Sequence, residues 1–269
     1  MTSTLLLPLS RRVLRERWKG LIGWILGVVS LIAIQVSVYP TIRDSRKGWS
    51  DVTEQFPEAF KKIFRMEDYT SPVGYLTTEL FSFMIPLIFI GLATTWAARS
   101  ASEEEENGTA DILMSLPISR SAILLTRLMT MVSVVVLLVA ITALALLAGT
   151  EAVDMNVGVL RIFQSSLACG LLSLPFGGVA VVLSATTGRR GIGLGGGLGI
   201  AIAAFVLYSL APLVALLQHL LPINPFQWTI GQSPLANGID PKWAFTTLVV
   251  SGCLYGGAFM AFQRRDING

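Results

Sequence analysis

The sequence predicts an all-α integral membrane protein with six transmembrane helices. Of its 269 residues, 53% are hydrophobic and only 14% are charged, whereas an average soluble domain carries roughly 25% charged residues. This composition excludes a disordered chain, a coiled coil and an ordinary soluble enzyme. A bilayer crossing takes about 20 mostly apolar residues. Six stretches meet that length, at about residues 20–39, 80–98, 122–148, 157–186, 192–210 and 243–262.

We expect the first stretch to be a true span, because it is too long and too far from the N-terminus for a cleaved signal peptide. Six spans place both chain ends on one side. Basic residues gather there, so we expect that side to be cytoplasmic and the membrane to be the cell (inner) membrane. They are Arg11, Arg12, Arg15, Arg17, Lys19, Arg99, Arg120, Arg127, Arg189, Arg190, Arg264 and Arg265. An aromatic belt is expected from Trp18, Trp24 and Trp96 at the inner ends and from Trp228 and Trp243 at the outer ends.

Two segments outside the spans have helical patterns. Before the first span, Leu14, Trp18 and Leu21 share one helical face and basic residues occupy the others, which predicts an N-terminal amphipathic helix at the inner interface. The outer loop, at about residues 41–78, carries an apolar stripe at Phe56, Phe60, Ile63 and Phe64. This stripe indicates a helix that caps the bundle, or alternatively a lid over a substrate exit.

Prolines and glycines occur within several spans and are expected to interrupt or kink them. Ile192 to Leu221 contains no charged residue and is too long for one straight crossing. We expect the fifth span to end near Leu210, before Pro212, and to be followed by a short re-entrant or interfacial helix; one long kinked helix is the alternative. Pro86 and Pro175 should kink spans two and four. Pro175 with Gly177 and Gly178 is a candidate hinge or, equally, a static kink.

Several kinds of chemistry are not indicated. The glycine-rich run from Gly191 opens an apolar span, so it suits close helix packing through Gly191, Gly195 and Gly199 better than dinucleotide binding. No G-x-x-x-x-G-K-[ST] loop is present. One histidine, His219, and two cysteines predict neither a metal site nor a disulfide framework. We therefore expect no enzymatic activity, no bound cofactor and no nucleic-acid partner.

The centres of the spans contain no Asp, Glu, Lys or Arg. Ion-coupled transporters usually need an ionisable residue at mid-depth, so the sequence favours movement of apolar or amphipathic molecules with energy supplied from outside the chain. The polar residues within the spans are neutral, and most are expected to form hydrogen bonds between helices. They are Gln35, Thr142, Gln164, Ser165, Ser173, Tyr208, Thr246, Ser251 and Tyr255.

The loop at about residues 99–121, between spans two and three, contains a compact helical pattern. Gly108 favours a turn, Thr109 can cap a helix whose first turn includes Asp111, and Pro117 ends it. Leu113 and Leu116 give that helix a short apolar stripe. It can be interpreted as a helix that docks into the groove of another protein, or as an elbow on the membrane surface beside the solvated acidic run of Glu103, Glu104, Glu105 and Glu106.

This loop resembles that of the membrane subunits of ABC-2-type transporters, through the pattern E-x-G-T-x-x-x-L-x-x-x-P-x-[ST]-R. The matching residues are Glu106, Gly108, Thr109, Leu113, Pro117, Ser119 and Arg120. The six spans, the interrupted region after the fifth and the basic C-terminal Gln263–Ile267 are also similar to that family. The run of four glutamates is more acidic than the pattern requires.

The resemblance implies a complex of two permease subunits, identical or paired with a sibling, with two copies of an ABC ATPase subunit that bind ATP and Mg. The loop helix would be the coupling helix. Its acidic run would contact the ATPase, Gly108, Thr109 and Pro117 would shape it, and Arg120 would anchor it to headgroups or to the partner. We thus expect an exporter permease for a drug, natural product or lipid. The alternatives are a stand-alone secondary transporter or channel, a membrane scaffold or immunity factor, or a component of envelope maturation.

Overall fold

The structure is a computed structural model that describes residues 3–45, 56–57, 69–106 and 119–264. In these residues the chain forms helices and no strand, and six helical segments are long and apolar enough to cross a bilayer. The predicted fold class is therefore confirmed. The long helices are α1 (Ser3–Asp44), α5 (Ile85–Glu106), α7 (Arg120–Ala152), α8 (Val159–Thr187), α9 (Arg190–Leu210) and α13 (Pro241–Arg264).

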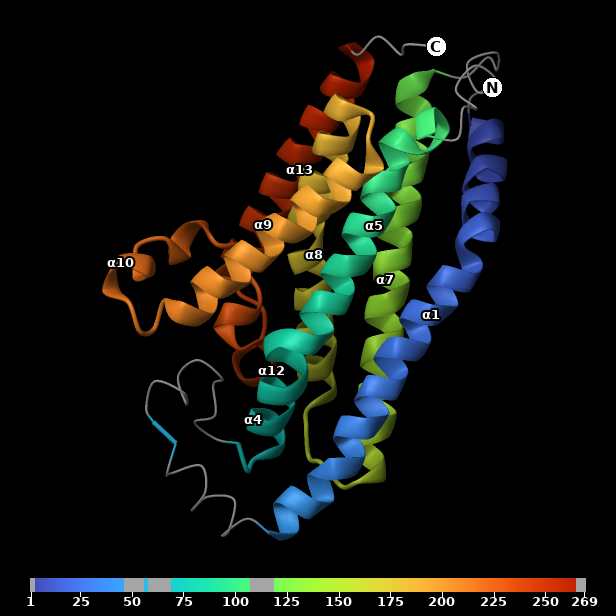
Figure 1. Ribbon diagram of the computed structural model, residues 1–269. Helices are drawn as coiled ribbons and strands as arrows, with labels where there is room; N and C mark the ends of the chain where they lie inside the picture. Colours follow the sequence, from blue (N-terminus) through green and yellow to red (C-terminus); the bar gives the residue numbers. More distant parts are fainter. Residues whose placement is uncertain (1–2, 46–55, 58–68, 107–118, 265–269) are drawn as a thin grey trace.

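Helix α8 is the most buried of the six crossings. It packs against α5, α7, α9 and α13, while α1 lies along the outside of the bundle against α7 (Figure 1). The start of α1, the C-terminal end of α5, the start of α7 and the end of α13 lie at one end of the bundle, which we call the basal end. We call the opposite end, where α1 ends and α7 runs into α8, the distal end.

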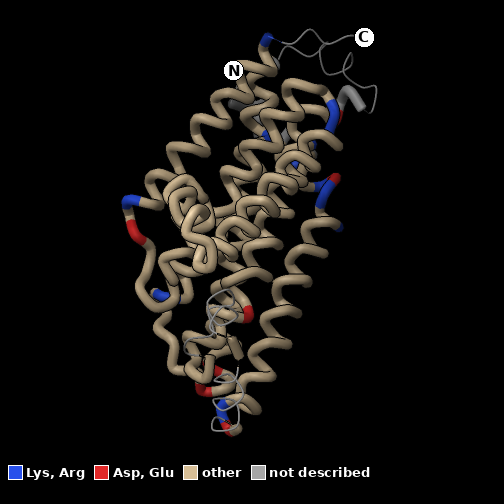
Figure 2. Tube along the Cα trace, turned by 60° about the vertical axis from the view of Figure 1, so that its left-hand side comes forward, with Lys and Arg blue, Asp and Glu red and all other residues tan. Residues whose placement is uncertain are grey.

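The middle parts of the crossings contain no charged residues, and Figure 2 shows long uncharged stretches along the helices. Between Gly20 and Thr41 in α1, and between Gly191 and Leu210 in α9, the sequence contains no Asp, Glu, Lys or Arg. A helix satisfies its own backbone hydrogen bonds and needs none from its surroundings. Uncharged helices of this length are the form that a chain can take in hydrocarbon.

Helix α1 differs from the expectation of a separate interfacial helix. It continues from Ser3 to Asp44 without a break, so the basic segment and the first crossing form one element. The sequence from Arg11 to Lys19 contains neither glycine nor proline, so nothing in it ends the helix. A displacement of the basic segment would therefore also displace the first crossing.

The second crossing begins earlier than the apolar pattern predicts. Helix α4 (Pro72–Leu76) begins this crossing, and a π-helix, η2 (Thr77–Met84), joins α4 to α5. The Ser71 hydroxyl caps α4 by accepting a hydrogen bond from the amide of Gly74 at 3.0 Å. Proline in the first helical turn is favoured, and this Ser-Pro signal stands within the segment expected to be a loop. Of the apolar stripe predicted in the loop at about residues 41–78, Phe60, Ile63 and Phe64 lie outside the described residues.

The proline of α8 does not interrupt that helix, which continues from Val159 to Thr187 around Pro175. The glycines after it serve a close approach. An added Cβ at Gly178 would lie 2.7 Å from the Leu254 Cβ, and one at Gly177 would lie 3.0 Å from the Tyr255 hydroxyl oxygen. The Tyr255 hydroxyl donates a hydrogen bond to the carbonyl of Leu174 at 2.8 Å. This segment is a tight contact between α8 and α13.

Helix α9 ends at Leu210, directly before Ala211 and Pro212. The chain then folds into short helices that project to one side of the bundle, with α10 at about its mid-height (Figure 1). They are α10 (Ala215–Gln218), η3 (Leu221–Ile223), α11 (Pro225–Trp228), η4 (Ile230–Gln232) and α12 (Pro234–Asn237). The single long kinked helix is thus excluded, and the apolar run is divided at the proline.

Most hydroxyl groups within the spans do not link helices, which corrects the expectation. Ser165, Ser173 and Ser251 each donate to a backbone carbonyl three or four residues earlier in their own helix, at 2.7–2.9 Å. A hydroxyl in hydrocarbon finds such a carbonyl without any neighbour. Gln35 and Tyr255 do connect different helices.

The glycines of α9 form two stripes along the helix, one of Gly193 and Gly197 and one of Gly191, Gly195 and Gly199. The two stripes have different surroundings. Gly193 and Gly197 pack against α8, where an added Cβ at Gly193 would lie 2.6 Å from the Ala180 carbonyl oxygen and would overlap the Ser184 hydroxyl. Gly191, Gly195 and Gly199 have no described atom within 4 Å of an added Cβ. The second stripe is therefore not used for packing within the described chain.

Replacement of Gly193 by alanine should destabilise the protein, whereas Gly195→Ala should not. The methyl group at Gly193 would meet a backbone carbonyl that cannot move alone, and overpacking costs about 1–3 kcal/mol. The melting temperature of the purified protein in detergent measures both variants, which have equal helix propensities. Equal melting temperatures would contradict the packing of α9 on α8 described above.

Candidate functional site

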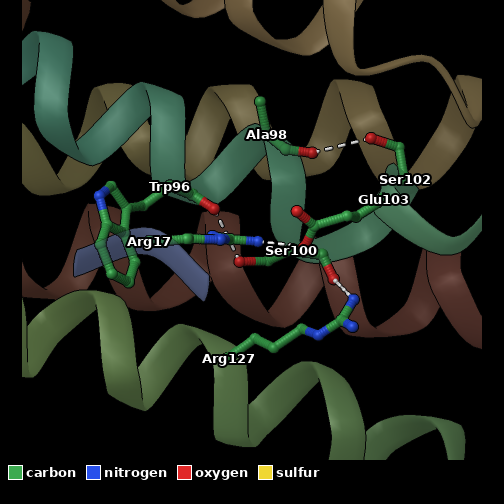
Figure 3. A network of polar contacts seen from close by, with 7 residues as sticks. All are labelled: Arg17, Trp96, Ala98, Ser100, Ser102, Glu103 and Arg127. Atoms are coloured by element: carbon green, nitrogen blue, oxygen red, sulfur yellow. Dashed lines mark hydrogen bonds and ion pairs between the residues drawn. The ribbon is translucent and has the colours of Figure 1, made fainter. Parts of the chain in front are cut away.

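A cluster of charged and aromatic side chains lies at the basal end, where three crossings meet. Helix α5 contributes Trp96, Ser100 and Glu103, which follow one another at spacings of four and three residues and so share one helical face. Arg17 reaches this face from α1, and Arg127 reaches it from α7 (Figure 3). We call these five residues the basal cluster.

Arg17 is the centre of the basal cluster and is only 7% exposed. Its Nη2 donates to the Glu103 carboxylate, and its guanidinium carbon lies 5.1 Å from the centre of the Trp96 ring. A guanidinium at this distance from an indole ring gains a cation–π interaction. One cation thus joins α1 to two successive turns of α5. Trp96, expected in an interfacial belt, is 4% exposed and belongs to this packed contact instead.

Arg127 joins α7 to the same turns. Its Nη1 donates to the backbone carbonyl of Ser100 at 3.2 Å, while the Ser100 hydroxyl donates to the Trp96 carbonyl at 2.8 Å. Four glutamates at the C-terminal end of α5 are unfavourable, because the helix dipole places negative charge there. The two arginines supply positive charge at that end and offset it.

The predicted coupling residues divide into those that the structure describes and those that it does not. Glu103 is engaged by Arg17 within the chain, and Glu104, Glu105 and Glu106 complete α5, but their side chains lie outside the described part. Arg120 begins α7, after Ser119, whose hydroxyl accepts a hydrogen bond from the Ala122 amide at 3.3 Å. The predicted loop helix lies outside the described residues, with Gly108, Thr109, Asp111, Leu113, Leu116 and Pro117.

Of the other predicted residues, Gly177 and Gly178 form the contact between α8 and α13 shortly after Pro175, and Pro212 follows the end of α9. The roles of Arg17, Trp96 and Arg127 were missed, since the sequence suggested only basic residues and a tryptophan near the inner interface. The signal that could have found them is an arginine at the apolar start of a crossing, because a cation there needs a partner.

A second polar cluster ties α1 to the second crossing at the distal end. Glu79 of the π-helix accepts hydrogen bonds from the Tyr69 hydroxyl at 2.7 Å and from the Gln35 amide at 3.4 Å. The Tyr75 hydroxyl donates to the Gln35 backbone carbonyl at 2.9 Å. Burial and the neighbouring Glu79 carboxylate raise the pKa of Tyr69, so this phenol stays protonated and keeps donating. π-Helices often occur at functional sites, but here both carboxylate oxygens already have partners.

The described residues offer no arrangement for metal chemistry: no group of three or more His, Cys, Asp or Glu side chains among them could hold a metal ion. Arg17 and Glu103 pair with each other, and Arg127 donates to the Ser100 carbonyl. The cluster can transmit a displacement between helices, because it links three of them by short polar contacts.

The six long apolar helices indicate a multi-pass membrane protein. The sequence model of the ABC-2 family transporter proteins matches residues 10–267, which is nearly the whole chain. The chain therefore belongs to the ABC-2 transporter family. A search of curated proteins returns no match.

Replacement of Arg17 by alanine should lower the melting temperature by about 5 °C, because loss of a charged hydrogen bond that leaves a partner poorly solvated costs about 2 kcal/mol. Arg15→Ala, at an exposed position of the same helix, is the matched control. Thermal unfolding in detergent is the measurement.

The pairing itself is tested by exchange of the charges. Arg17→Glu combined with Glu103→Arg should recover part of the stability that Arg17→Glu alone loses. A double variant no more stable than the single one would show that these two side chains do not interact.

Proposed function

We propose that this chain is the permease subunit of an ATP-driven ABC-2 exporter that moves an apolar or amphipathic molecule outward. A separate ABC ATPase, present in two copies, would bind ATP and Mg, and two permease subunits would form the passage. In this proposal the basal end faces the cytoplasm, as the concentration of basic residues on that side favours.

The basal cluster is the observation that carries this proposal. Glu103 stands in the last turn of α5, immediately before the loop segment whose sequence resembles a coupling helix. An ATPase that pushes on this segment would act first on the end of α5. A rigid connection is needed there, because a displaced helix end would otherwise only fray.

The connections of the basal cluster predict where the push travels. Arg17 joins the end of α5 to α1, so the long first helix should tilt with it. Arg127 holds the Ser100 carbonyl, so α7 should follow as well. Helix α5 also packs along α8, and α8 in turn contacts α13 closely through Gly178. The six crossings would thus respond to one input at the basal end.

The cargo should be apolar or amphipathic, because the middle of each crossing lacks charged residues. A charged solute or an inorganic ion would meet no compensating charge there, and its desolvation would be costly. An apolar molecule needs only shape and contact surface from the passage.

The test co-expresses this chain with a candidate ABC ATPase subunit, purifies the complex and measures ATP hydrolysis after reconstitution into liposomes. The complex should hydrolyse ATP several-fold faster than the ATPase alone and should move a fluorescent phospholipid or lipophilic dye only when ATP is present. Transport by this chain alone, with an ion gradient and no ATPase, would refute the proposal.

Leu113→Glu should weaken the complex, because a charge on the apolar stripe of the coupling segment would oppose docking into a protein groove. We expect at least a fivefold loss of ATPase co-purification with unchanged insertion of the permease. Glu151→Lys, an exposed change at the distal end of α7, is the control and should retain the ATPase. Equal recovery of the ATPase with both variants would remove the docking role from this segment.

A further inference from the structure

An apolar crevice of about 400 Å³ lies between α8, α9, α13 and the short helices that follow α9. Its walls include Pro175 and Phe176 of α8, Ala203 and Ala204 of α9, and Leu254 of α13. Binding sites for small molecules have volumes of about 300–1,000 Å³. The crevice is therefore large enough for part of a small molecule, and it is separate from the basal cluster.

The polar groups in the crevice wall are already occupied. The Asn224 amide donates to the Ala204 carbonyl at 2.8 Å, and its oxygen accepts from the Phe226 amide at 3.0 Å. The Trp228 indole nitrogen donates to the Pro222 carbonyl at 2.7 Å. A wall whose polar atoms bond to one another offers only apolar contact to an occupant, so it suits hydrocarbon and disfavours a polar or charged group.

The crevice lies along a helix that is long and apolar enough to cross a bilayer. It follows α9 from Ile200 to Leu207, which is the distal half of a helix that ends at Leu210. The hydrocarbon of the distal leaflet is thus the material that surrounds this opening.

The rim of the crevice is open toward that leaflet. Ile200 and Ile223, which line it, are 49% and 71% exposed. Both are aliphatic, so an occupant can slide in sideways from the leaflet without passing a polar barrier. Ala203 and Ala204 leave the space free, because larger side chains at these positions would fill it.

We propose that this crevice binds one acyl chain of a phospholipid from the distal leaflet. The bound chain wedges between α9 and α8 beside Pro175 and fills a space that the side chains leave open. The assignment requires only that the protein lies in a bilayer. It does not depend on ATP-driven transport or on the identity of the cargo.

The experiment uses the purified full-length chain, without any ATPase, in nanodiscs of phosphatidylethanolamine and phosphatidylglycerol with a small fraction of phosphatidylcholine that carries a diazirine on one acyl chain. After irradiation, mass spectrometry locates the labelled peptides. We expect labelling of the peptides around Ala203 and Ile223, and we expect Ala203→Trp to reduce it at least fivefold. Ile202→Trp is the matched control, because the neighbouring Ile202 is 58% exposed and does not line the crevice; it should change labelling less than twofold.

Other occupants give different results. Equal labelling of both tryptophan variants would overturn the proposal, because the lipid contact would then be that of any exposed surface. If Ala203→Trp leaves lipid labelling unchanged but abolishes transport when the chain is reconstituted separately with the ATPase, the crevice belongs to the cargo and the proposal is overturned. A disulfide between two chains through Ile223→Cys in a Cys253→Ser background, with no lipid labelling, would identify a second copy as the occupant.

The variants must be folded for this comparison to hold. The melting temperatures of Ala203→Trp and Ile202→Trp are measured first, and Ala203→Leu replaces the larger variant if that one unfolds. Leucine fills less of the crevice and should reduce labelling at least twofold. If Ala203→Leu is folded and labels like the unmodified chain, the proposal is wrong.

Discussion

A bilayer supplies no hydrogen-bond partners, and this constraint explains most features of the structure. The crossings are helices because helices satisfy their own backbone, and their hydroxyls turn back to carbonyls of the same helix, as at Ser165 and Ser251. In the described residues, charged side chains lie toward the ends of the crossings, and Arg17 pairs there with Glu103. The helix of the fifth crossing stops near a proline, and the chain then packs its backbone into short turns.

The basal and distal ends of the bundle are built differently. At the basal end, Arg17 and Arg127 lie close to the negative end of α5 and hold α1 and α7 against it. Toward the distal side, the short helices after α9 leave an apolar crevice beside α8, α9 and α13. A stiff basal end suits the reception of a mechanical input, and an interrupted distal end suits contact with hydrocarbon.

The basal cluster also changes the interpretation of the acidic run. Glu103 was expected to face a partner protein, but its carboxylate is bound by Arg17 of the same chain. The first glutamate of the run therefore has a structural contact within the chain, in addition to its predicted contact with a partner. The close packing of Gly178 against Leu254 likewise makes the region after Pro175 a tight contact between α8 and α13.

The sequence by itself determined the fold class, the approximate crossings and the resemblance of the loop after the second crossing. These follow from local composition and spacing, because hydrocarbon selects long uncharged helices whatever their neighbours are. Only the tertiary structure decided that Arg17 meets Glu103 and Trp96, that Gly193 packs while Gly195 does not, and that a crevice remains beside Ala203. Each of these depends on the rotation of one helix against another, which side-chain packing over the whole bundle sets and no local pattern records.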